Sequence, residues 1–216
     1  MNALNRPTDD SPMSSGEEAL GTEPEADTRT RIVAATAMLL QRQGYEGTSI
    51  KRILVDSRAT YGSLYHFFPD GKEQLAAEAL RYGSADFAAL LSRGLESSED
   101  VGTAIANCAL YLADSLRASQ WTDGCPVAAT ALELIGRSPL IQQASDESLH
   151  QWRALIADRL KRGGASQVEA HALACTVLST LEGAELLSRV SSDDEPLRLA
   201  AVHMEKLAVM VTARDS

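Results

Sequence analysis

The chain has 216 residues, of which 44% are hydrophobic and 5% aromatic, and its formal net charge at pH 7 is −10. This length allows one large domain or two small ones, and the apolar content can form an ordinary core. Ala and Leu recur while alternating β-branched runs are scarce, which predicts an all-α fold. No apolar run approaches the roughly 20 residues of a membrane span, and the N-terminus does not resemble a signal peptide, so we expect a cytoplasmic protein.

The charge is distributed unevenly along the chain. Residues 1–27 contain seven acidic residues, one arginine and three prolines, which predicts a disordered acidic tail. Residues 28–81 contain eight basic and five acidic residues, whereas the remainder is acidic again. A positive segment inside an acidic chain is typical of a surface that meets a phosphate backbone.

The positive segment predicts three short helical elements. Apolar residues at helical spacing predict a helix from Thr28 that stops at Gly44. Thr48 is expected to cap a second helix, which runs to about Ser57. Thr60 is expected to cap a third, which cannot continue past Phe68 because Pro69 follows.

The second and third helices have the pattern of a helix-turn-helix. Ile53, Leu54, Ala59, Leu64 and Phe68 are predicted to form its small core. This packing leaves polar and aromatic side chains on the third helix to enter the major groove of DNA. Gly62 lowers helix propensity there but allows the backbone to approach DNA closely.

The same segment resembles the TetR family of transcriptional repressors. Members commonly have a Gly-Ser-Leu-Tyr-His-His-Phe-like string followed by Lys-Glu-x-Leu, matched here by residues 62–68 and 72–75, together with residues 44–50. Residues 124–128, with the inserted Asp70-Gly71, are similar to the LmrA/YxaF branch of the family. The resemblance implies a DNA-binding domain at residues 28–75 and a ligand-binding and dimerisation domain at residues 76–216.

The resemblance also implies which residues contact DNA. The expected base and phosphate contacts are Thr48, Lys51, Tyr61, Gly62, Ser63, Tyr65, His66 and Lys72. Thr48 could equally be a plain helix cap. The chain departs from the family at Arg58, in a turn position that is usually glycine, and at Tyr61, where lysine or glutamine is common. A non-glycine residue in a left-handed turn costs about 1 kcal/mol, so we expect Arg58 either to shift the turn slightly or to add a phosphate contact.

Beyond Gly71 the pattern predicts a long connecting helix to about Arg93, followed by a helical bundle. The expected bundle helices are 100–119, 126–136, 139–163, 166–190 and 195–213. The resemblance implies a homodimer built from the last two. Their predicted apolar stripes are Ala170, Leu173, Ala174, Val177, Leu181 and Ala184, and Leu197, Ala201, Met204, Leu207, Ala208 and Val211, although part of each stripe must serve the internal core.

The bundle of the resembled family encloses a small-molecule pocket. Tyr111, Trp121 and Trp152 are our candidates for lining it, because aromatics with a polar tip suit a mainly apolar cavity. By analogy, the expected effector is lipophilic or aromatic. The expected partners are therefore a palindromic double-stranded DNA operator, this effector and a second copy of the chain, without a cofactor.

Three alternatives remain open. Cys125 precedes Pro126 at a predicted helix start, where a thiolate would be favoured, so a redox-sensing repressor is one of them. An enzyme is the second, but no residues stand at catalytic or metal-binding spacing, and Glu182 and Glu185 are expected to be surface or pocket-edge acids without a metal. The third, a helical adaptor that does not bind DNA, would leave Tyr65, His66 and Lys72 unexplained.

Overall fold

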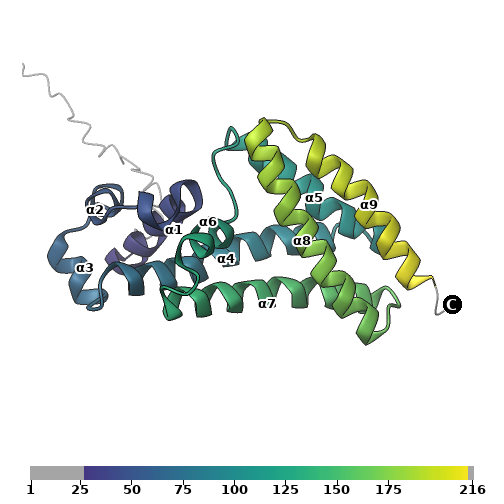
Figure 1. The fold of residues 1–216 in the computed structure, drawn as a ribbon, viewed down its shortest axis with the longest axis horizontal. Helices are drawn as coiled ribbons and strands as arrows, with labels where there is room; N and C mark the ends of the chain where they lie inside the picture. Colours follow the sequence, from purple (N-terminus) through teal and green to yellow (C-terminus); the bar gives the residue numbers. More distant parts are fainter. Residues whose placement is uncertain (1–26, 214–216) are drawn as a thin grey trace, which may run out of the picture.

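The computed structural model describes residues 27–213, and in this range it contains nine helices and no strand (Figure 1). The predicted all-α fold is confirmed. Apart from Asp27, the predicted acidic tail lies outside the described residues. The helices are α1 (Thr28–Gly47), α2 (Ile50–Ser57), α3 (Tyr61–Phe67), α4 (Lys72–Leu95), α5 (Val101–Ala118), α6 (Pro126–Leu134), α7 (Pro139–Arg162), α8 (Gln167–Ser191) and α9 (Glu195–Thr212).

Helix α1 begins and breaks where the sequence predicts. The Asp27 side chain caps it by accepting a hydrogen bond from the Thr30 N–H at 2.8 Å. At Gly44 the helix is interrupted by a backbone with φ 70° and ψ −173°, and a last turn leads to Gly47. Glycine suits this position because an L-residue rarely adopts a positive φ.

The start of α2 differs from the prediction by one residue. Ser49, and not Thr48, is the N-cap, since its hydroxyl accepts from the Arg52 N–H at 3.2 Å. Thr48 is fully buried, and its hydroxyl donates to the Gly44 carbonyl at 2.7 Å. The threonine therefore closes the kink at the end of α1 instead of opening α2.

Helices α2 and α3 form the predicted helix-turn-helix. Arg58 ends α2 in the left-handed conformation, with φ 52° and ψ 39°, and Thr60 caps α3 by accepting from the Ser63 N–H. Leu64 and Phe68 are fully buried. They share one hydrophobic core with α1, α2, the first half of α4 and a few residues of α6 and α7.

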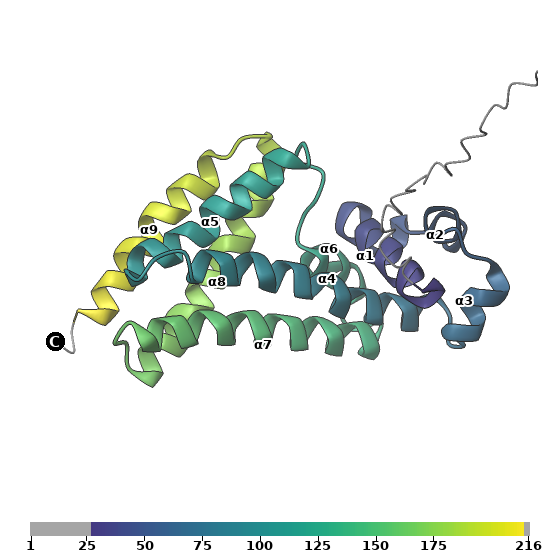
Figure 2. The same cartoon turned by 180° about the vertical axis from the view of Figure 1, so that it is seen from behind.

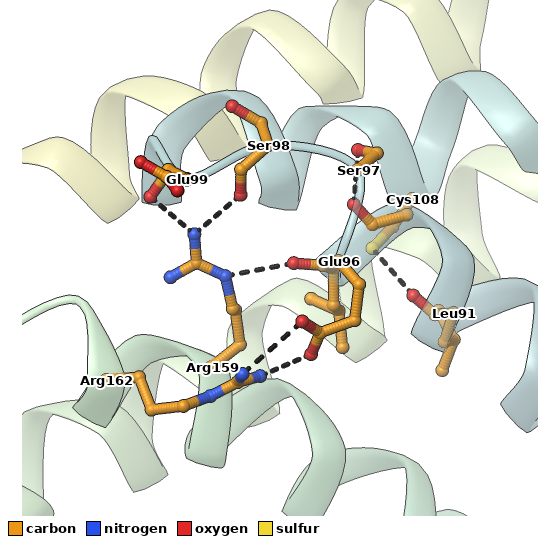
Figure 3. Close-up of polar contacts among 10 residues, drawn as sticks. Leu91, Glu96, Ser97, Ser98, Glu99, Cys108, Arg159 and Arg162 are labelled. Atoms are coloured by element: carbon orange, nitrogen blue, oxygen red, sulfur yellow. Dashed lines mark hydrogen bonds and ion pairs between the residues drawn. The ribbon is translucent and has the colours of Figure 1, made fainter.

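Helix α4 joins this region to the bundle, and α7 runs beside it (Figures 1 and 2). The indole N–H of Trp152 on α7 donates to the Ser84 carbonyl of α4 at 3.0 Å. At the far end, the buried Arg159 donates to the carbonyls of Leu95, Ser98 and Glu99 at 2.7–2.9 Å (Figure 3). The bond to Leu95 satisfies a carbonyl that the end of α4 leaves without a partner, and the other two hold the loop between α4 and α5.

The five bundle helices begin and end within about two residues of the predicted bounds. We expected at least half of the residues in the two predicted dimer stripes to serve the internal core, and most of them do. Ala170, Ala174, Val177 and Leu181 of α8 belong to the bundle core, as do Leu197, Ala201, Met204 and Ala208 of α9. Small apolar residues occupy more than one face of each helix, so the stripe itself did not show which face is internal.

Between residues 27 and 213, no helix is long and apolar enough to cross a membrane.

Candidate nucleic-acid interface and effector cavity

Helix α3 presents two different faces. Leu64 points into the core and is fully buried. On the other face, Tyr61 and Tyr65 are 55% and 47% exposed, and His66 is exposed beside them. The structure therefore brings three of the predicted DNA-contacting residues onto one uncovered helix face.

Gly62 and Ser63 lie in the first turn of α3. Gly62 is exposed, and a Cβ atom added to it would meet nothing closer than the Thr60 hydroxyl, at 3.8 Å. Packing within the chain thus does not require glycine here, whereas a close approach to DNA would. Ser63 is half-buried, and its hydroxyl lies 3.0 Å from that of Thr60. Both residues remain in reach of a ligand that docks on this face.

A surface hollow between α2 and α3 brings Lys51 and Tyr61 together. Arg58, for which the sequence leaves open a small shift of the turn or an added phosphate contact, lines the same hollow. Lys51 and Arg58 are exposed, while the neighbouring Arg52 is paired with Asp56 at 2.8 Å. The exposed position of Arg58 beside Tyr61 favours the second possibility, because basic residues beside a recognition helix commonly contact phosphates.

Two predicted contact residues are directed into the protein. Thr48 is buried, and its N–H and hydroxyl are both used in the α1 kink, so it cannot donate to a phosphate. Lys72 is half-buried; its ammonium donates to the Tyr45 carbonyl at 2.6 Å and lies 3.9 Å from the centre of that ring. Burial lowers the pKa of Lys72. Lys72 thus anchors the end of α1 onto α4.

A cavity of about 100 Å³ lies where α1 and α4 meet the bundle. It combines an apolar wall with three acidic side chains. Its lining residues are Gln41 of α1, Gly83, Asp86, Phe87 and Leu90 of α4, Leu112, Ser115 and Leu116 of α5, Asp123 and Gly124 of the following loop, Pro126 of α6 and Glu185 of α8. The cavity thus touches both the helix-turn-helix region and the bundle.

Of the two positions expected for Glu182 and Glu185, surface or pocket edge, the second fits Glu185, which lines the cavity, while Glu182 is largely buried one helical turn before it on α8. Glu185 is only 3% exposed, and burial together with the neighbouring Glu182 raises its pKa to about 8, although Arg189 acts in the opposite direction. Burial also raises the pKa of Glu182. Their position could have been foreseen, because Glu185 follows Leu181 by one helical turn and so continues the apolar stripe of α8.

Cys125 does not have the reactive environment that its sequence position suggested. It is the N-cap of α6, and its sulfur accepts from the Ala128 N–H at 3.4 Å, as expected for a residue before Pro126. Burial, however, raises the pKa of the Cys125 thiol well above its usual value, and the carboxyls of Glu182 and Glu185 raise it further. The inference of a favoured thiolate is therefore wrong, since burial outweighs the helix N-terminus.

The three aromatic candidates for the effector pocket lie apart from one another. Trp152 is fully buried and packs on Phe87 with ring centres 4.3 Å apart, so it supports the cavity wall without lining it. Tyr111 is half-buried and lines a separate surface hollow, where Arg93 lies over its ring. Trp121 packs on the edge of the bundle core. Phe87 is the aromatic residue that sequence reasoning missed.

This architecture, a helix-turn-helix joined by a long helix to a second bundle, defines a class of regulatory DNA-binding protein. Residues 32–79 match the family described as bacterial regulatory proteins, tetR family. Residues 102–203 match the C-terminal domain of LmrA/YxaF-like transcriptional regulators.

Curated relatives agree with both matches. The uncharacterized regulator YxaF of Bacillus subtilis is 33% identical over 185 residues, which cover 86% of this chain and 95% of YxaF. The regulator LmrA of the same organism is 31% identical over 79% of this chain and 91% of LmrA. The chain therefore belongs to the TetR family of transcriptional regulators, in its LmrA/YxaF-like branch, and is not an enzyme.

Solved structures support the fold. Escherichia coli NemR in its reduced form has a TM-score of 0.72 at 23% identity, covering 84% of this chain and 97% of NemR. A regulatory protein TetR from Rhodobacter sphaeroides has a TM-score of 0.73 at 21% identity, covering 83% and 98% of the two chains.

Proposed function

We propose that this chain is a homodimeric repressor in the cytoplasm that binds a palindromic double-stranded DNA operator and leaves it when a small effector binds. The observation that carries the proposal is the division of α3 into a buried face with Leu64 and an exposed face with Tyr61, Tyr65 and His66. A recognition helix needs both faces, because the buried face packs against its own domain while the exposed face enters the major groove. The position of Lys51 and Arg58 beside Tyr61 supports contacts with the flanking phosphates.

The proposed dimer rests on apolar side chains that the chain itself does not cover. On α8, Leu186, Leu187 and Val190 are 60–80% exposed, and on α9, Leu199 and Met210 are 54% and 53% exposed. Neighbouring exposed apolar residues of this kind mark an interface. A two-fold dimer carries two copies of α3, so its operator would have two half-sites about 34 Å, or a multiple of that distance, apart.

The proposed release follows from the position of the cavity. Gln41 of α1 and Phe87 of α4 both line it, so a ligand there contacts the region that carries α3 as well as the bundle. A lipophilic or aromatic effector that fits one arrangement of these helices better than another would shift the population away from the DNA-binding one.

A binding titration tests the function. Purified protein is titrated onto a labelled duplex from upstream of its own gene and onto a scrambled duplex of equal length, at about 0.15 M salt. We expect the upstream duplex to bind at least about a thousandfold more tightly, the usual lower bound for a specific complex. Equal affinity for both duplexes would contradict the proposed autoregulatory repressor.

A further inference from the structure

Several buried polar atoms beside the cavity lack a partner inside the protein. Among the residues that the structure describes, the Ser188 hydroxyl, Glu182 Oε1 and Arg189 Nε are buried without a hydrogen bond. They lie on α8 within about one helical turn of Glu185, which lines the cavity. Buried polar groups are nearly always paired, so such a group of exceptions indicates a site that a ligand completes.

Arg189 does not act as a close counter-ion for Glu185. Its guanidinium packs against Gly124, where an added Cβ atom would lie 1.9 Å from Nη1, and it donates to the Thr122 carbonyl at 3.0 Å. The loop before α6 therefore holds this side chain. Among the described residues, Glu185 makes no ion pair, so a buried carboxyl is left facing the cavity.

The rest of the lining favours a positive charge. Asp86 and Asp123 add two further carboxyls to that of Glu185. The Phe87 ring, which Trp152 fixes from behind, offers an aromatic surface to a cation. Leu90, Leu112 and Leu116 supply the apolar wall, and the volume of about 100 Å³ suits a small amine.

We propose that this cavity binds the protonated amino group of a small apolar amine, with Glu185 as its counter-ion. The inference rests on the proposed effector response and gives the effector a positive charge. The unpaired oxygens of Ser188 and Glu182, within about one helical turn of Glu185 on α8, are our candidate acceptors for the remaining N–H groups of the ammonium or for a water that it carries.

Binding of the amine transfers one proton to the solvent. Burial and the neighbouring Glu182 raise the pKa of Glu185 to about 8, while Arg189 and the Cys125 N–H lower it in part. Near neutral pH, Glu185 is therefore mainly a neutral acid in the empty protein. An ammonium ion beside it favours the carboxylate, so the acid gives up its proton as the ion pair forms. Asp86 and Asp123 face the same cavity from α4 and the loop.

Calorimetric titration with benzylammonium, without DNA, tests the proposal, and neutral benzyl alcohol of nearly the same shape is the comparison ligand. We expect benzylammonium to bind the wild-type protein at least about tenfold more tightly than benzyl alcohol, which corresponds to roughly 1.4 kcal/mol. Repeating the titration in two buffers of different ionisation enthalpy should reveal the release of up to one proton per site.

Two variants locate the site. Glu185→Gln should remove both the preference for the cation and the proton release, whereas Glu99→Gln, at an exposed acid outside the cavity lining, should change neither. Should Glu185→Gln not fold, Asp86→Asn at the exposed rim should still weaken benzylammonium binding. The proposal would be overturned by any of three results: no binding of benzylammonium, equal affinity for both ligands, or a folded Glu185→Gln protein that still prefers the cation. Operator affinity of the ligand-free protein is measured separately, so either hypothesis can fail while the other stands.

Discussion

Arg42 on α1 lies 2.7 Å from Asp123 in the loop before α6, from its Nε to the carboxylate Oδ1. Asp123 also lines the cavity, so this ion pair joins the helix-turn-helix region directly to the proposed effector site. The pair is partly exposed and contributes only about 0–1 kcal/mol to stability. Its importance is expected to lie in coupling, because a cation in the cavity competes with Arg42 for Asp123.

Arg42→Gln should therefore uncouple ligand from operator. We expect benzylammonium to weaken operator binding by the wild-type protein, and the operator to weaken benzylammonium binding by the same factor. In Arg42→Gln that factor should fall toward one. The control is Arg81→Gln, which removes an ion pair with Glu147 at 2.8 Å that also crosses between helices but lies outside the cavity lining. Identical factors in all three proteins, measured by anisotropy, would refute the role of Arg42.

The exposed apolar face of α8 should hold the dimer together. A charge placed there by Val190→Glu, at a side chain that is 80% exposed, should cost little in the monomer but be buried unpaired at the interface. We expect the molar mass from light scattering to fall from two chains toward one at micromolar concentration. Leu132→Glu on α6, at a residue exposed to 79%, is the matched control. A Val190→Glu protein that remains as dimeric as this control would place the interface elsewhere.

Arg58 has a left-handed backbone conformation, which is strained, and a positive side chain that we expect to contact DNA. Arg58→Gly should stabilise the fold by up to about 1 kcal/mol, because glycine tolerates the left-handed conformation. It should also weaken operator binding, since a basic side chain beside Tyr61 is lost. The control is Ser192→Gly, since Ser192 has the same left-handed conformation, with φ 54°, at the end of α8. This variant should stabilise the fold without changing operator affinity. Urea unfolding and operator titration separate the two effects, and equal operator affinity for both variants would deny Arg58 a DNA contact.

The buried Glu185 should make stability depend on pH. Its pKa rises from about 4.5 to about 8 on folding, so the neutral acid is tolerated at low pH, and stability is lost as pH rises through this window. Glu182, Arg189 and Cys125 are the titratable groups around it outside the cavity lining. We expect urea midpoints of the wild-type protein to fall more between pH ~5 and pH ~9 than those of Glu185→Gln. Parallel pH profiles would show that Glu185 titrates normally.

The sequence predicted the local elements well because their signals are local. Thr60 and Pro69 bound α3, and Gly44 breaks α1, as the preferences of these residue types require. Thr48 and Ser49 are both good caps, however, and only the packing of Thr48 into the α1 kink decides between them. The family motif placed Tyr65 and His66 on the surface, and their exposure agrees.

The resemblance predicted a pocket in the bundle, but the lining of the proposed effector cavity depends on tertiary packing and was not predicted. Glu185 is buried because α8 turns it toward the loop before α6, and the same burial keeps the Cys125 thiol protonated. Trp152 and Tyr111 were chosen by residue type alone. The depth of Trp152 in the core and the position of Tyr111 in a separate hollow follow from helix crossings that a single sequence does not specify.

The most direct test of the account is operator binding by the double variant Tyr65→Ala/His66→Ala. Both side chains lie on the exposed face of α3, so helical content and dimer mass should be unchanged while affinity for the upstream duplex falls by at least about tenfold, or roughly 1.4 kcal/mol. Tyr82→Ala, at a tyrosine on α4 that is 44% exposed, should bind like the wild-type protein. If the double variant, folded and dimeric, kept wild-type affinity for the operator, α3 would not be the DNA-binding surface and the central claim would be contradicted.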